Sequence, residues 1–294
     1  MSTADMARTT ISTPAARQHP DWSRNALVLA GALIILALAV TALLAPWMAP
    51  RPVSEQDLPS RLSPPSAEHP LGCDELGRDI LSRLVYGSRI SLKVGVTVVF
   101  ISGLIGMVIG MVSGWYGGLL DELLMRLIDI LLAFPGILLA IALVAVLGPG
   151  LNHVILALCL TGWVGYARLA RAQTLKVKEL DFVTAARAQG SGPGRLIFRH
   201  VAPNILGPMI VQATLGMAGA ILAEAGLSFL GLGVVPPQPS WGAMLNTGCS
   251  HLSTAPHLTL FPGLAIMLVV LGFNFLGDGL RDMLDPKLRK TRGS

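Results

Sequence analysis

The sequence predicts an all-α polytopic membrane protein with six transmembrane helices. Of its 294 residues, 52% are hydrophobic and only 13% are charged, whereas a soluble globular protein carries roughly a quarter charged residues. Uncharged runs recur along the chain, and about 20 apolar residues are enough for a helix to cross a bilayer. Basic residues gather in cytoplasmic loops, which explains the net charge of +5 without a nucleic-acid partner.

Residues 1–25 form the first predicted segment, a polar cytoplasmic tail without periodicity that we expect to be disordered. Residues 26–46 are the first predicted transmembrane helix, because Ala26–Ala45 is an uncharged apolar run of sufficient length. A cleaved signal peptide is the competing interpretation. Its apolar core would span only about 7–15 residues, so we favour an uncleaved anchor.

Residues 47–92 follow as a predicted periplasmic segment. Its first half is rich in Pro and indicates an extended loop. Asp74 is suited to cap a helix. After it, Leu and Ile side chains cluster on one side, while Arg78 and Arg83 lie elsewhere. That pattern predicts an amphipathic helix at the membrane surface.

Residues 93–280 form the predicted transmembrane core. Its five apolar runs complete the six spans: Val94–Leu120, Asp121–Leu147, Leu151–Ala167, Ile205–Leu230 and Leu258–Leu276. The first of these runs carries Gly106, Gly110 and Gly114 at a spacing of four, a stripe of small residues that lets helices approach closely. We interpret the stripe as a packing feature and not as a site.

The run that begins at Asp121 combines charges with a proline. Asp129 would lie at or just inside the membrane interface, and Pro135 would kink the helix. One interpretation is that the kink shapes a translocation path. The alternative, which we favour, is that the charges anchor the cytoplasmic end of a helix.

Glu224 is the one carboxylate deep in an apolar run. An ionisable side chain inside a membrane is a functional candidate by default. A proton relay would need partners at the same depth, and the other spans offer none. We therefore expect Glu224 to lie towards one end of its helix or to bond to a neighbouring backbone group, with a direct transport role as the alternative.

Lys176–Pro203 is the segment around which the chain is organised, because it is charged, helix-prone and flanked by apolar runs. Val177–Gln189 is a good helix former. Gly190 suits a helix C-terminus, because glycine readily adopts the left-handed conformation that ends a helix. Turn residues 191–194 then lead to a second short helix, Arg195–Val201. These residues alone leave a simple connection between spans and a docking surface equally open.

The spacing within this segment resembles a known motif. The tripeptide Thr184-Ala185-Ala186 is followed by Gly190 and, thirteen residues later, by Pro203. This resembles the "EAA" loop of ABC importer permeases, although Thr184 stands where the motif has Glu. The resemblance implies a cytoplasmic coupling loop, residues 172–204, that docks into an ATPase subunit. The candidate coupling residues are Asp181, Thr184, Ala185, Ala186, Gly190 and Pro203.

Further blocks extend the resemblance from about residue 26 to residue 289. They are LGCDELGRDILSRLVYGSRISL, AILAEAGLSFLGLGVVPPQPSWGAML and the closing GDGLRDMLDPKLR. These blocks are similar to the second permease of dipeptide, oligopeptide and nickel importers. The resemblance therefore implies a type I ABC importer permease fold.

The resemblance also implies a function and a set of partners. This chain would form half of the translocation pathway for dipeptides or oligopeptides, with nickel or a nickel chelate as the alternative. Its partners would be a homologous second permease, two ATPase subunits, membrane lipid and a periplasmic or lipid-anchored substrate-binding protein. ATP and Mg would be bound by the ATPase subunits, so we expect no cofactor in this chain. The candidate contacts to the binding protein are Asp74, Arg78 and Trp241, and we also expect Trp241 to be an aromatic anchor at the interface.

Charge placement predicts a multi-pass protein of the inner membrane with both termini in the cytoplasm, residues 281–294 being the C-terminal tail. Sixteen of the 22 Lys and Arg residues fall in the segments assigned to the cytoplasm. The other six lie in the first outer segment and weaken the rule there. The two later outer loops contain no Lys or Arg, which decides the direction.

Several chemistries have no pattern in this sequence. It contains no G-x-x-x-x-G-K-[ST] motif, so we expect neither nucleotide binding nor enzymatic activity. Its His and Cys residues lack metal-ligand spacing, and a disulfide between Cys73 and Cys249 stays open. A self-sufficient ion-coupled transporter or channel is the alternative of another class. It should show charged or unwound elements at mid-membrane depth, where we find only Glu224.

Overall fold

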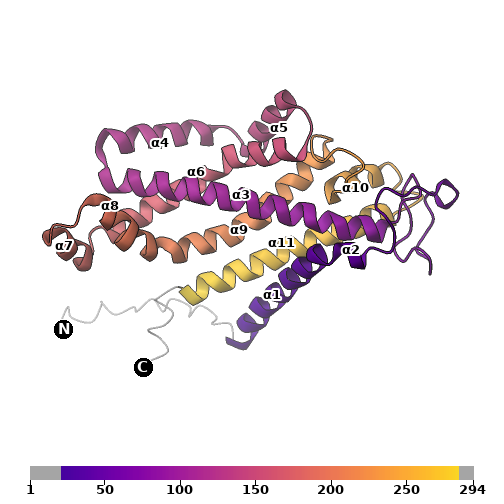
Figure 1. The fold of residues 1–294 in the computed structure, drawn as a ribbon, viewed down its shortest axis with the longest axis horizontal. Coiled ribbons are helices and arrows are strands. Elements are labelled where there is room, and N and C mark those ends of the chain that lie inside the picture. Colours follow the sequence, from indigo (N-terminus) through magenta and orange to yellow (C-terminus); the bar gives the residue numbers. More distant parts are fainter. Residues whose placement is uncertain (1–20, 285–294) are drawn as a thin grey trace, which may run out of the picture.

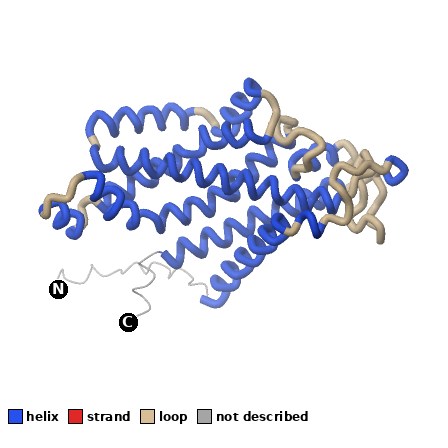
Figure 2. Tube along the Cα trace, viewed as in Figure 1, coloured by secondary structure: helices blue, strands red, loops and turns tan. Residues whose placement is uncertain are grey.

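The computed structural model describes residues 21–284, and the regular structure in that range is helical throughout (Figure 2). The elements in chain order are α1 (Asp21–Leu43), α2 (Ala45–Met48), η1 (Leu58–Ser60), α3 (Ile80–Tyr116), α4 (Gly118–Ala133), α5 (Gly136–Leu147), α6 (Leu151–Val177), α7 (Asp181–Ala188), α8 (Pro193–Arg195), the π-helix η2 (Leu196–Val201), α9 (Ala202–Phe229), α10 (Trp241–Cys249) and α11 (His257–Leu284). The all-α prediction is thus confirmed. The prediction of an unstructured tail over residues 1–25 is wrong at its end, because α1 already begins at Asp21. The rest of that tail, residues 1–20, and the end of the C-terminal tail, residues 285–294, lie outside the described range.

Five helical stretches and one bent pair of helices are candidates for the six predicted membrane crossings. Five helical stretches are long and apolar enough to cross a bilayer: Ala26–Leu43, Ile80–Tyr116, Leu151–Val177, Pro193–Phe229 and His257–Leu284. Helices α4 and α5 together form the sixth candidate, although they are bent by 83° at the break between them.

The long helices run lengthwise through the molecule (Figure 1). Helices α7 and α8 project at one end, which we call the α7 end. The loops of residues 49–79 lie with α10 towards the opposite end, which we call the loop end. Any signal between the two ends must therefore travel along the long helices.

Helix α3 corrects the prediction for the segment 47–92. No separate amphipathic helix exists there, because α3 begins at Ile80 and continues unbroken for 37 residues to Tyr116. Asp79, not Asp74, is the N-terminal cap, since its side chain accepts a hydrogen bond from the backbone N–H of Ser82. The predicted boundary between residues 92 and 93 lies inside this helix, which continues through Gly87 and Gly95 without a break.

The glycine stripe brings α3 against α6, as the sequence predicts. A Cβ atom at Gly106 would stand 2.5 Å from the Trp163 carbonyl oxygen, and one at Gly110 would stand 2.2 Å from that of Ala167. These distances are shorter than any normal van der Waals contact, so only glycine permits this approach of the two backbones.

Pro135 divides the third predicted span more sharply than a kink. Helix α4 ends at Ala133 and α5 begins at Gly136, with Pro135 in the break. Proline cannot donate the backbone hydrogen bond that would continue α4. As a result α5 turns away from the direction of α4 (Figure 1).

Apolar clusters fill the space between the helices. The loop-end cluster, named here for its position, joins α3, α5, α6 and α9 and includes Val94, Val98, Val144, Val154, Leu158 and Leu227. The α7-end cluster includes Met111, Ala170, Val177, Val183, Val201 and Ile205. The second cluster connects the bundle to α7, and thus positions the candidate site.

The predicted outer loop after Leu230 is also more ordered than expected. It contains α10, whose first turn is capped by Ser240, and Gly242 packs so closely on α9 that a Cβ would stand 2.0 Å from the Ala225 carbonyl oxygen. This segment is therefore part of the packed bundle at the loop end.

Candidate functional site

The candidate site is the α7 segment, defined here as residues 178–203 between α6 and α9. The sequence predicts one helix over Val177–Gln189, and this is wrong at its start. Helix α6 ends at Val177, Leu180 is extended with φ −75° and ψ 146°, and α7 begins only at Asp181. The break lets α7 turn away from α6 and project at the end of the molecule (Figure 1).

Gly190 ends α7 as predicted. Its φ is +84°, the left-handed conformation that favours glycine. Two backbone hydrogen bonds close the turn, from the Gly190 N–H to the Arg187 carbonyl at 3.0 Å and from the Ser191 N–H to the Ala186 carbonyl at 3.2 Å. No atom lies within 4 Å of the position where a Cβ would stand, so glycine is required here by backbone conformation and not by space.

Helix α7 buries a single side chain, and most of its other side chains are exposed. Val183 is completely buried. Asp181, Thr184 and Ala185 are exposed, whereas Ala186 is half-buried against the α7-end cluster. Two large apolar side chains beside them also face outwards, Leu180 at 46% exposed and Phe182 at 43%. An exposed apolar and polar surface on a short helix is suited to contact another protein.

Two basic side chains tie the α7 segment to the end of α3. The Arg187 guanidinium lies 5.1 Å from the centre of the Trp115 ring, a cation–π contact. Lys178 Nζ donates a hydrogen bond to the Gly114 carbonyl at 3.0 Å. Both contacts would transmit a displacement of α7 directly to α3.

A second tie joins α4 to α6 at the same end. Arg171 donates from Nε and Nη2 to the two Asp121 carboxylate oxygens, each at 2.5 Å. Ser113, near the end of α3, also donates to this carboxylate. Bidentate Arg–carboxylate pairs are strong and fix geometry. Sequence reasoning missed this pair, because 50 residues separate its members and nothing in the sequence signals that the two ends meet.

Thr184 and Pro203 have local roles. The Thr184 hydroxyl donates to the Leu180 carbonyl at 3.2 Å, one turn back in the chain. Pro203 is exposed in the first turn of α9 and has no backbone N–H to donate to the preceding turn. The short helix predicted over Arg195–Val201 is present but begins at Pro193 and continues through η2 into α9 without a break.

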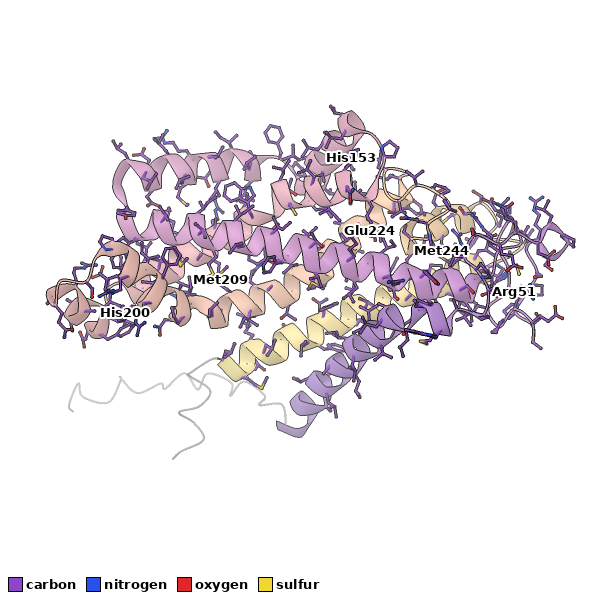
Figure 3. The ribbon with its side chains drawn as sticks, viewed as in Figure 1. Arg51, His153, His200, Met209, Glu224 and Met244 are labelled. Carbon is purple, nitrogen blue, oxygen red and sulfur yellow. The ribbon has the colours of Figure 1, made fainter. Side chains whose placement is uncertain are left out.

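Asp129 and Glu224 lie apart from the α7 segment. Asp129 pairs with Arg168 of α6, and both side chains are more than half exposed. Glu224 is fully buried among the helices (Figure 3). Its Oε1 accepts a hydrogen bond from Ser228 at 2.7 Å, and its Oε2 has no partner among the described residues. The position near the end of α9 is as predicted, but the partner is a side chain one turn ahead and not a backbone group.

The loop end buries the residues predicted to contact a binding protein. Asp74 pairs with Arg78 at 2.6 Å and with Arg83 at 3.4 Å, and all three side chains are buried. The Trp241 indole N–H donates to the Leu84 carbonyl at 2.9 Å, and its ring packs on Gly87. Trp241 is therefore an internal packing residue and not an interfacial anchor. Contact of Asp74, Arg78 or Trp241 with a binding protein stays a prediction.

The described part of the chain contains neither a cluster of metal-ligating side chains nor a disulfide. Within residues 21–284, no three His, Cys, Asp or Glu side chains are grouped so that they could hold a metal ion. Cys73 and Cys249 are both free, the first buried and the second exposed.

Comparison with known proteins agrees with this architecture, which is that of a multi-pass membrane permease. The model of the family described as binding-protein-dependent transport system inner membrane component matches residues 106–290, and a model of the N-terminal transmembrane domain of oligopeptide transport permease C matches residues 21–65. This chain belongs to the binding-protein-dependent transport permease family.

Similar proteins cover nearly the whole chain. The dipeptide transport system permease protein of Alkalihalophilus pseudofirmus is 47% identical over 90% of this chain and 88% of its own length. The di/tripeptide transport system permease protein of Pseudomonas aeruginosa is 46% identical over 92% of this chain and 91% of its own. A glutathione transport system permease protein of Escherichia coli has the same identity and coverage.

Proposed function

We propose that this chain is the permease subunit of a peptide importer, in which partner ATPases supply energy through the α7 segment. One observation carries the proposal: α7 exposes almost its whole surface, yet Arg187 and Lys178 tie this segment firmly to α3. A loop that only connected two spans would need no such ties. A docking helix needs both a free surface and a rigid attachment.

These contacts indicate how motion would pass from an ATPase subunit to the membrane helices. An ATPase subunit that moves α7 would displace the end of α3 through Trp115 and Gly114. The Asp121–Arg171 pair would carry the same displacement to α4 and α6. Rigid helices transmit such motion as bodies, because packed interfaces move between discrete arrangements.

Membrane orientation and partners complete the proposal. The α7 end faces the cytoplasm and the loop end the periplasm, with both termini cytoplasmic, because seven basic residues lie between residues 168 and 199. A homologous second permease forms the other half of the pathway. Two ATPase subunits bind ATP and Mg, and a periplasmic or lipid-anchored protein delivers substrate to the loop end.

Peptides are the proposed substrate. The relatives described above are named for dipeptides, di/tripeptides and glutathione, all of which contain amide-linked amino acids. Nickel or a nickel chelate remains the alternative substrate. A self-sufficient ion-coupled transporter is the alternative of another class, and Glu224 would then be the residue to pursue.

The test is a pull-down of the tagged chain from detergent-solubilised native membranes. We expect a second permease and nucleotide-binding subunits to co-purify with ATPase activity. The complex in proteoliposomes should then take up dipeptides when ATP and the cognate binding protein are present. If the chain purifies alone and moves solute without ATP, the proposal is wrong.

A further inference from the structure

A hollow of about 240 Å³ lies between α3, α6 and α9. Its polar side chains come from all three helices: Ser102 from α3, Thr161 and Tyr166 from α6, and Gln212 from α9. The hollow has no charged residue in its lining. Glycines keep it open, since Gly219 has no atom within 4 Å of the position of a Cβ.

The hollow lies between the two apolar clusters defined above. Val98, Leu158 and Ala220 line it and belong to the loop-end cluster, whereas Tyr166 belongs to the α7-end cluster. The hollow is therefore a polar region between two apolar clusters, near the middle of three membrane-spanning helices. Polar groups at such depth are expensive, and in membrane proteins they mark substrate paths.

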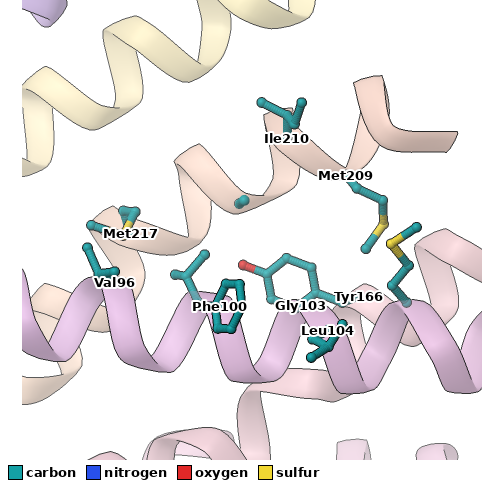
Figure 4. A pocket seen from close by; sticks show the side chains of 11 residues that line it. Val96, Phe100, Gly103, Leu104, Tyr166, Met209, Ile210 and Met217 are labelled. Atoms are coloured by element: carbon teal, nitrogen blue, oxygen red, sulfur yellow. The ribbon is translucent and has the colours of Figure 1, made fainter. Parts of the chain in front are cut away.

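Tyr166 supplies an observation that points to a ligand. Its side chain is only 5% exposed, yet its hydroxyl has no hydrogen-bond partner among the described residues. The hydroxyl lies against Gly216, where a Cβ would stand 2.2 Å from the oxygen. Figure 4 shows the ring between α3 and α9, where it also borders an apolar pocket of about 370 Å³. Buried hydroxyl groups are normally paired, so this one is available to a molecule in the hollow.

The other polar groups complete a neutral set. The Gln212 amide makes no hydrogen bond within residues 21–284. Thr161 donates to the Ala157 carbonyl at 3.2 Å and keeps acceptor capacity. Together these groups offer uncharged donors and acceptors, which match the N–H and C=O groups of an amide bond.

We propose that this hollow is a substrate subsite on the translocation path, where the Tyr166 hydroxyl and the Gln212 amide bond to the peptide backbone. This inference rests on the proposed function, peptide import, and names the residues that would contact the peptide. The backbone is what all peptides share, so a subsite for amide bonds would pass peptides with different side chains.

The test uses Tyr166→Phe and Gln212→Leu in the whole importer, reconstituted in proteoliposomes with its binding protein. Each variant should lower dipeptide uptake by about threefold to tenfold, the effect of one hydrogen bond. Assembly and ATP hydrolysis should persist. Tyr166→Phe removes a hydroxyl that has no hydrogen-bond partner within residues 21–284, so the thermal unfolding temperature of the complex should not fall. Tyr116→Phe, at an exposed position outside the hollow, is the matched control and should transport normally.

A second substrate separates a backbone contact from a general defect. A depsipeptide, with an ester in place of the amide, lacks the N–H group. If the contact is direct, at least one of the substitutions Tyr166→Phe and Gln212→Leu should reduce uptake of the depsipeptide by a smaller factor than it reduces uptake of the dipeptide. This is the comparison that a double-mutant cycle makes. If the wild type imports dipeptides and both variants do so equally well, the subsite is refuted while the proposed function stands. If the wild type imports no peptide, the proposed function itself fails.

Discussion

Asp121 and Arg171 show how single residues hold the α7 end together. Their bidentate pair is only partly exposed, and Ser113 adds a third group from α3. The contribution of this pair to stability should therefore lie between two limits. An exposed ion pair contributes under about 1 kcal/mol, whereas disrupting a buried one costs about 3–5 kcal/mol.

We expect Asp121→Asn to destabilise the protein by about 1–2 kcal/mol, because Arg171 loses its carboxylate while remaining partly buried. Thermal unfolding of the purified complex measures this change. Glu122→Gln, which breaks the exposed pair with Arg126, is the control and should have little effect. Equal effects of the two substitutions would contradict a structural role for Asp121.

Gly190 tests the coupling role of the turn after α7. Gly190→Pro would force φ to about −65° and remove the N–H that bonds to Arg187. We expect ATP hydrolysis without uptake in this variant, with normal membrane insertion. Gly190→Ala should be milder, since the left-handed conformation costs about 1–2 kcal/mol.

Two controls accompany the Gly190 variants. Gly192→Ala should be silent, because Gly192 has φ −69° and open space around it. Thr184→Ala should also transport, because its hydroxyl bonds only within the segment. Coupled transport at the wild-type rate in Gly190→Pro would refute the docking role.

The cysteines give a prediction that depends on pH. Burial raises the pKa of the Cys73 thiol, so at pH 7–8 it holds less of the reactive thiolate than an ordinary cysteine. We expect maleimide to label the exposed Cys249 rapidly and Cys73 slowly, with the rate at Cys73 increasing as pH rises towards its raised pKa. Mass spectrometry of labelled peptides measures both rates, and denatured protein is the control in which both sites react. A disulfide between them would abolish both reactions and contradict the structure.

At the scale of elements, sequence reasoning succeeded where one physical signal dominated. Apolar length located the spans, and the four-residue glycine spacing marked the face of α3 that packs closely on another helix, which the structure shows to be α6. It failed at helix ends, which depend on tertiary contacts. Asp79 caps α3 and also bonds to His69, ten residues away, and no local pattern distinguishes it from Asp74. The α7 segment was found from its motif spacing, whereas its ties through Trp115 and Asp121 join residues remote in sequence.

Gly110→Ala tests the close packing of α3 on α6. Alanine usually stabilises a helix interior by about 1 kcal/mol relative to glycine. Here its Cβ would meet the Ala167 carbonyl oxygen at 2.2 Å, so we expect lower thermal stability and poorer assembly. Gly103→Ala on the same helix is the matched control, because its nearest neighbour, in the Tyr166 ring, would be 3.8 Å away. Similar stability of the two variants would show that the helices separate at no cost.

At the scale of the whole molecule, α3 connects the two functional ends. Its 37 residues span about 55 Å at 1.5 Å per residue. One end receives the contacts of the α7 segment, and the other holds the buried cluster of Asp74, Arg78 and Arg83. A rigid rod between them would let ATP-driven motion at α7 reach the loop end, where we propose that a binding protein delivers substrate.

The most direct test of this account is photo-crosslinking from Phe182 in the assembled importer. Phe182 is exposed on α7, so a photoreactive amino acid there should capture an ATPase subunit, identified by mass spectrometry. The same group at Thr254, exposed at the loop end, should capture no ATPase. If Phe182 yields no ATPase adduct in a complex that transports peptide with ATP, the α7 segment is not the coupling site and the account is wrong.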